Sequence, residues 1–99
     1  METHLSVRNL DFDKAQSLGG NEKVVTKFKE SIRKVHLQYG TDFAKISDKV
    51  SKIFAKIFCS QAWKKLSQED KLEIKNICHL HYNPNNFQTQ DWNALLKTK

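Results

Sequence analysis

The stretch "VVTKFKESIRKVHLQYG", residues 24–40, decides the fold together with its continuation "TDFAKISDKVSKIFAKIF", residues 41–58. In the first stretch, apolar residues recur at the spacing of three and four that puts side chains on one helix face. They are Val24, Val25, Phe28, Ile32, Val35 and Tyr39. Because Asn21 can cap a helix and Gly40 can end one, the pattern predicts a helix from Asn21 to Tyr39.

The second stretch keeps the same helical period, and Thr41 or Asp42 can begin its helix. Its apolar residues are Phe43, Ile46, Val50, Ile53, Phe54, Ile57 and Phe58. Glycine and proline are absent from residues 41–83. The sequence therefore leaves open whether 42–66 is one helix or two, with a bend near Ser47 or Ser51.

A third helix is predicted from about Gln68 to Tyr82. Ser67 stands three residues before Asp70, which is the spacing of a capping box, and Pro84 follows the predicted end. Trp63, just before this start, is predicted to be a buried aromatic at a helix junction. A short tail helix with Trp92, Leu95 and Leu96 on one side can follow.

Strand patterns are almost absent, so the predicted class is all-α. We expect a small bundle of three main helices with an N-terminal arm and a short C-terminal helix. The predicted division is an arm over residues 1–20, a helical domain over 21–83 and an extension over 84–99.

The chain is basic, with 17 Lys and Arg against 11 Asp and Glu in 99 residues. Its net charge of +6 suits an anionic partner, which can be nucleic acid, an acidic protein or an anionic membrane surface. No apolar run has the length of a membrane span and the N-terminal residues lack a secretory pattern, so we expect an intracellular protein without a membrane role. Cys59 and Cys78 are predicted to be small buried residues in a reducing compartment.

Lysines form two lines at helical spacing beside the apolar faces. The first line holds Lys23, Lys27 and Lys34, and the second holds Lys45, Lys49, Lys52 and Lys56. If the two helices pack through their apolar faces, the lines can join into one surface that follows a phosphate backbone. An ordinary solvated face explains the same spacing equally well.

Other chemistry finds little support in the sequence. Cys78, His79 and His81, with Cys59 upstream, fit no standard zinc spacing. His36 is predicted to be half-buried rather than catalytic. No nucleophile motif or phosphate loop occurs, so we predict neither an enzyme nor a bound metal or cofactor.

A family resemblance enters at "WKKLSQEDK", residues 63–71, which resembles the junction of helices two and three in HMG boxes. "VTKFKESIRKV", residues 25–35, is similar to the first helix of that family, and "VSKIF", residues 50–54, is similar to its I-S-K stretch. The downstream "HYNPNNFQTQDW" resembles the HMG-like mating-type alpha-box proteins of fungi. A weaker resemblance links "YGTDFAKISDKV", residues 39–50, to Myb/SANT domains.

The HMG resemblance implies a nuclear protein of chromatin or transcription that binds the minor groove of duplex DNA, with Val25 or Thr26 as the wedge between bases. Together with the lysine lines, it gives these further candidate DNA contacts: Lys23, Lys27, Arg33, Lys34, Lys45, Lys49, Ser51, Lys52 and Lys56. The alternative is a helical accessory subunit without DNA binding of its own, which would meet a protein partner through Leu72, Phe87 and Trp92.

Overall fold

The computed structural model describes residues 10–83, 85, 87–89 and 91–97, and this part of the chain is helical without strands. The predicted all-α class is therefore confirmed. The main helices are α1 (Phe12–Tyr39), α2 (Phe43–Phe58), α3 (Gln61–Lys65) and α4 (Gln68–Asn76). Shorter elements follow: the π-helical turn η2 (Ile77–His81), the 3-10 turn η3 (Phe87–Thr89) and α5 (Trp92–Leu95).

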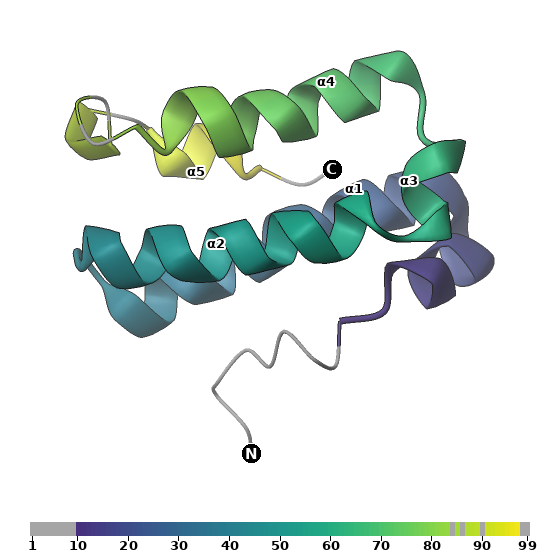
Figure 1. Ribbon diagram of the computed structural model, residues 1–99, viewed down its shortest axis with the longest axis horizontal. Helices are drawn as coiled ribbons and strands as arrows, with labels where there is room; N and C mark the ends of the chain where they lie inside the picture. The colour runs from purple at the N-terminus through teal and green to yellow at the C-terminus, as the bar shows by residue number, and fades with distance from the viewer. Residues whose placement is uncertain (1–9, 84, 86, 90, 98–99) are drawn as a thin grey trace.

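The long helices form a bundle in which α2 lies in front of α1 and α4 runs alongside them (Figure 1). The short helix α3 connects α2 to α4 at one end, and α5 lies behind α4. Helices α1 and α2 are joined by a tight turn at Gly40, whose φ of 60° favours glycine. The side chain of Asp42 then caps α2 by accepting a hydrogen bond from the backbone of Lys45 at 3.2 Å.

Helix α1 begins earlier than the sequence predicts. Asp11 caps it by accepting from the backbone of Lys14 at 2.9 Å, and the helix continues through a kink at Gly20, where φ is 71°. Asn21 does not open the helix as expected. Its side-chain amide donates to the carbonyl of Lys65 at 3.0 Å and so ties the kink to the end of α3.

The open question about residues 42–66 is resolved by a break at Cys59 and Ser60, away from both serines considered as bends. The hydroxyl of Ser60 accepts from the backbone of Trp63 at 3.3 Å and caps α3. Cys59 is exposed, which corrects the prediction that both cysteines are buried. The start of the third helix at Gln68 is confirmed, because Ser67 accepts from the backbone of Asp70 at 3.1 Å. The predicted helix to Tyr82 is α-helical only to Asn76, and the π-helical turn η2 continues it to His81.

The core is apolar and draws on nearly the whole described chain. Its fully buried centre includes Phe28, Ile32, Ile46, Ile53 and Ile74, and Trp63 is buried as predicted, at 8% exposed. The same core contains Leu10, Phe12 and Ala15 from the first segment and Phe87 and Leu96 from the last. The described residues on both sides of the predicted 21–83 domain thus pack into one common core.

Candidate nucleic-acid interface

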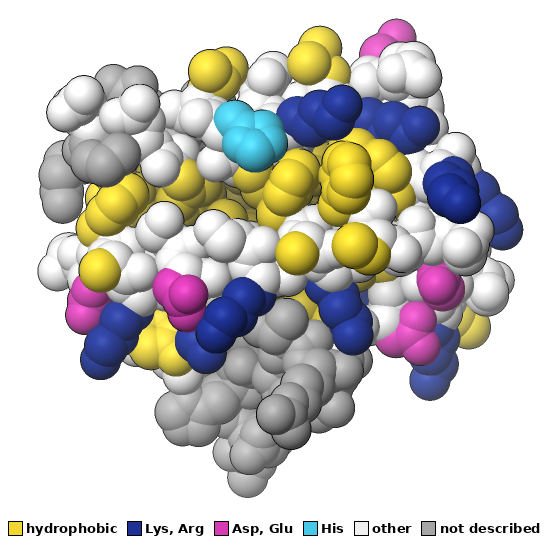
Figure 2. Space-filling view, viewed as in Figure 1, with side chains coloured by type: hydrophobic (Ala, Val, Ile, Leu, Met, Phe, Trp, Pro, Cys, Tyr) yellow, Lys and Arg dark blue, Asp and Glu magenta, His cyan; other side chains and the backbone are white. Residues whose placement is uncertain are grey.

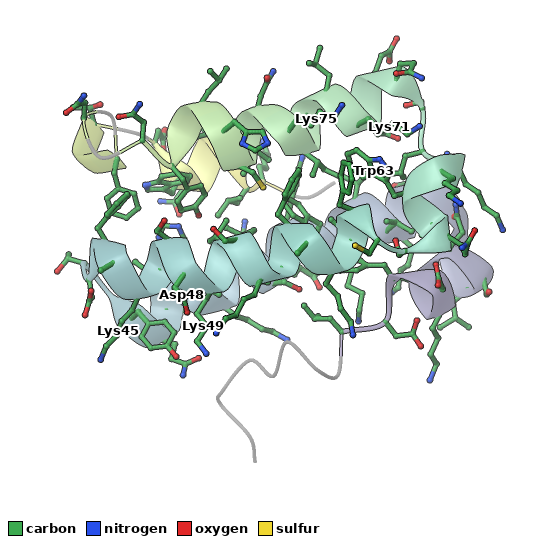
Figure 3. All side chains as sticks on the ribbon, viewed as in Figure 1. Lys45, Asp48, Lys49, Trp63, Lys71 and Lys75 are labelled. Carbon is green, nitrogen blue, oxygen red and sulfur yellow. The ribbon has the colours of Figure 1, made fainter. Side chains whose placement is uncertain are left out.

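The lysines of α2 lie along the edge of the helix that faces away from α4. Figure 3 shows Lys45 and Lys49 on this edge, and Figure 2 shows lysine side chains along it. The opposite edge of α2 carries Phe54, whose ring lies 6.3 Å from that of Trp63. Because Lys52 and Lys56 continue the spacing of four and three residues, they share the edge of Lys45 and Lys49.

The lysines of α1 lie on the corresponding edge. Contacts toward α4 and the C-terminal segment come from one flank of α1, where Lys29 pairs with Glu73 at 2.8 Å and His36 meets Tyr82. Lys27 and Lys34 occupy the other flank of the buried stripe.

The two predicted lysine lines therefore face the same side of the α1–α2 pair. We call this surface the basic face and define it by Lys23, Lys27, Lys34, Lys45, Lys49, Lys52 and Lys56.

Acidic residues limit the basic face in two places. Asp48 pairs with Lys52 at 3.2 Å, and both side chains are more than half exposed, so solvent screens the pair. Beyond Lys56, a surface hollow is lined by Asp11 and Asp13 as well as by the lysine. Asp48 also lines a hollow with Lys45 and Lys49, but its ion pair is with Lys52, and among the described residues Lys45 and Lys49 form no ion pair.

Four predicted contacts lie apart from the basic face. Arg33 donates from Nη2 to the carbonyl of Leu96 at 2.7 Å, which places its side chain on the C-terminal segment. The expected wedge residues Val25 and Thr26 line a separate hollow. Its charged residues are Glu22, Lys29, Asp70, Glu73 and Lys97. This hollow has no excess of positive charge to attract phosphate, so these two residues are poorly placed to insert between bases.

The fourth predicted contact, Ser51, is exposed on α2. Because it directly precedes Lys52 in the helix, its side chain points in a different direction and lies outside the lysine line.

A second surface, which the sequence did not indicate, lies between α2 and α4. Figure 2 shows hydrophobic side chains lining a hollow there. Phe54 and Phe58 stand one turn apart on α2, their ring centroids 5.7 Å apart, and Phe58 lies 5.4 Å from Trp63. Lys71 and Lys75 reach over the Trp63 ring, at 6.0 and 5.9 Å from its centroid. We call this surface the aromatic groove.

Two residues of the aromatic groove stand out. Phe58 is 49% exposed, although helical periodicity assigned it to the core. His79 closes one side of Phe54 in an edge-to-face contact at 5.1 Å. One feature of the sequence could have indicated this surface. Phe58 lies at the margin of the apolar stripe of its helix, where a side chain can be exposed.

A cluster of aromatic side chains at the start of α2 has the opposite character, and we call it the closed cluster. Its members are His36, Phe43, Tyr82, Phe87 and Trp92. The Nε2 atom of His36 and the hydroxyl of Tyr82 hydrogen-bond at 2.5 Å, and the indole N–H of Trp92 donates to the Phe87 carbonyl at 3.3 Å. His36 is partly buried, as predicted, and this burial lowers its pKa.

Burial also changes the acidity of Cys78 and of Tyr82 in the closed cluster. It raises the pKa of Cys78 to about 12. It also raises the pKa of Tyr82, with a smaller contribution from the charge of the Cys78 thiolate. Phe87, expected at a partner surface, is only 6% exposed and belongs to the core, whereas Leu72 is 58% exposed as predicted. Within the described residues, no three His, Cys, Asp or Glu side chains are grouped to hold a metal ion.

Comparison with known families, curated proteins and solved structures gives no match. The HMG-box resemblance therefore rests on the quoted motifs alone. Among the described helices, none has both the length and the apolar character needed to cross a bilayer.

Proposed function

We propose that this chain binds duplex DNA through the basic face, without reading the sequence of the bases. The observation that carries the proposal is the common orientation of the lysine lines of α1 and α2. Lysine ammonium groups contact phosphates as point charges, and such contacts position a protein on DNA without selecting a sequence. The separation of Val25, Thr26 and Arg33 from this face argues against base insertion as the mode of binding.

The dimensions of the lysine line suit a phosphate backbone. Lys45 and Lys56 stand eleven residues apart on one helix, so their Cα atoms lie about 16 Å apart along the axis. That length corresponds to about five base-pair steps of B-DNA at roughly 3.4 Å each. A line of this length can reach several consecutive phosphates of one strand.

The test compares two double variants with the same change of charge. Lys45→Gln with Lys49→Gln removes two lysines of the basic face that form no ion pair among the described residues. Lys71→Gln with Lys75→Gln removes two lysines from the aromatic groove. We expect the first variant to weaken binding to unrelated duplexes by similar factors. We also expect it to reduce the slope of log K against log salt by roughly one unit per lost phosphate contact.

The control variant should keep the native salt slope. The proposal is overturned if the native chain shows no salt-sensitive duplex binding at low ionic strength, or if both variants lose affinity equally. In the first case, the alternative of an accessory subunit without DNA binding takes its place. The proposal includes a role in chromatin or transcription and a location in the nucleus. Both depend on duplex binding and are rejected with it.

A further inference from the structure

The aromatic groove combines an apolar floor with a positively charged rim. Phe54, Phe58 and Trp63 come from two different helices and form its floor with ring centroids 5.4 to 6.3 Å apart. Lys71 and Lys75 stand on the α4 side of this floor (Figure 3). Phe58 gives this floor a half-exposed ring, and further hydrophobic side chains line the hollow beside it (Figure 2). A contiguous apolar patch with a charged rim marks a site for a ligand.

The charges of α4 are segregated between its two sides. Lys71 and Lys75 reach over Trp63, whereas Asp70 and Glu73 line the hollow on the other side with Lys29 of α1. The salt bridge between Lys29 and Glu73 at 2.8 Å holds one of these acids away from the aromatic groove. A ligand in the groove therefore meets two ammonium groups of α4, while these two carboxylates face elsewhere.

The size of the aromatic floor suits part of a helix. Phe54 and Phe58 stand one turn apart near the end of α2, about 6 Å along its axis. Amphipathic helices bind such grooves by inserting apolar side chains spaced three and four residues apart. With lysines on the rim, the complementary helix carries acidic residues beside its apolar face.

From these observations, we propose that the aromatic groove binds an acidic amphipathic helix of a protein partner, with Phe58 as the main apolar contact and Lys71 and Lys75 as the ionic contacts. Single-stranded nucleic acid also combines negative charge with flat apolar groups, but it stacks successive bases on successive open rings. In this groove only Phe58 is half exposed, while Trp63 is 8% exposed and covered by the two lysines. The arrangement therefore favours an inserted side chain over a series of stacked bases.

The test uses a synthetic peptide of about 16 residues with leucine and phenylalanine on one helical face and glutamate on the other. Calorimetry with the full chain should show saturable binding. A scrambled peptide of the same composition, which has no apolar face, should bind much more weakly. Phe58→Ala should weaken the peptide by about tenfold or more, as expected for the central contact of an interface.

Further variants separate the contributions. Lys71→Gln with Lys75→Gln should weaken the peptide and reduce the salt dependence of its binding. Lys45→Gln with Lys49→Gln should leave peptide affinity unchanged, so that failure here is distinguishable from failure of duplex binding. A matched apolar control is Leu37→Ala, because Leu37 is 80% exposed on α1 and lies outside the groove.

Three results would overturn the proposal: no saturable binding of the acidic peptide, equal binding of the scrambled peptide, or binding that survives Phe58→Ala. The proposal would also be overturned by tight binding of an oligothymidylate. In that result, Phe58→Ala abolishes the binding and the acidic peptide does not compete with it. That outcome would assign the groove to single-stranded nucleic acid instead.

Discussion

The closed cluster and the aromatic groove are built from similar side chains at opposite ends of α2, but they differ in what covers them. At the start of α2, Phe87 and Trp92 from the C-terminal segment pack on His36 with ring centroids 5.8 and 4.8 Å away. At the end of α2, Phe58 remains 49% exposed. The chain thus completes one aromatic cluster with its own residues and leaves the other accessible.

This difference assigns the two clusters different roles. In the closed cluster the rings pack on one another, and His36, Tyr82 and Trp92 are also hydrogen-bonded. Such packing stabilises the fold through dispersion and the removal of apolar area from water. A half-exposed ring contributes less to folding and remains available to a ligand. Stability should therefore depend on the closed cluster, and peptide binding on the aromatic groove.

The largest expected effect is on stability and comes from the closed cluster. Phe87→Ala removes a ring that contacts His36, Phe43 and Trp92 and leaves a cavity in the core. We expect a loss of about 3–5 kcal/mol in the free energy of unfolding, measured by urea denaturation. A loss below about 1 kcal/mol, the range of ordinary surface changes, would show that the C-terminal segment does not complete the core.

The second-largest expected effect is a loss of stability on acidification, which acts on the closed cluster through His36. Burial lowers the pKa of His36 below its ordinary value of 6.5, so the unfolded chain binds this proton more readily than the folded chain. Stability from this residue is therefore fully present above about pH 6.5 and is lost as the pH falls below it. We expect the melting temperature to decrease between neutral pH and about pH 5.

The control for this pH effect is His36→Gln, which removes the titrating group. The variant will be less stable at neutral pH, because it loses the hydrogen bond to Tyr82 and the ring contacts. Its melting temperature should nevertheless change less between the two pH values than that of the native chain. An equal change in both proteins would mean that other groups cause the acid sensitivity.

The smallest expected effect on stability comes from the aromatic groove. Phe58→Ala removes a ring that is already half in water, so we expect a loss of about 1 kcal/mol or less in the free energy of unfolding. Urea denaturation of this variant beside Phe87→Ala measures the comparison directly. If the two losses are equal, Phe58 is a core residue and the two clusters do not differ in role.

Features set by local chemistry were predictable from the sequence. The apolar stripes around Phe28 and Ile53 and the cap at Ser67 depend on residues within one or two helical turns of each other, and the structure confirms them. The lysine lines were predictable for the same reason, because helical spacing alone places Lys45 beside Lys49.

Features set by contacts between distant segments were not predictable in this way. Asn21 reads as a helix cap, but it bonds to Lys65, 44 residues away. The sequence suggests that Arg33 is one more cation of the basic face. In the structure, its guanidinium instead donates to the carbonyl of Leu96, 63 residues along the chain. The exposure of Phe58 depends on the position of α4, which its own helical pattern does not encode.

The most direct test of the central claim is to map amide chemical shifts of the ¹⁵N-labelled chain during titration with a duplex of arbitrary sequence at low ionic strength. We predict that the shifted amides follow the basic face, along α2 from Lys45 to Lys56 and on α1 near Lys27 and Lys34, and that added salt reverses the shifts. Shifts centred on Phe58 and Trp63, or no salt-sensitive shifts at all, would contradict duplex binding by the basic face.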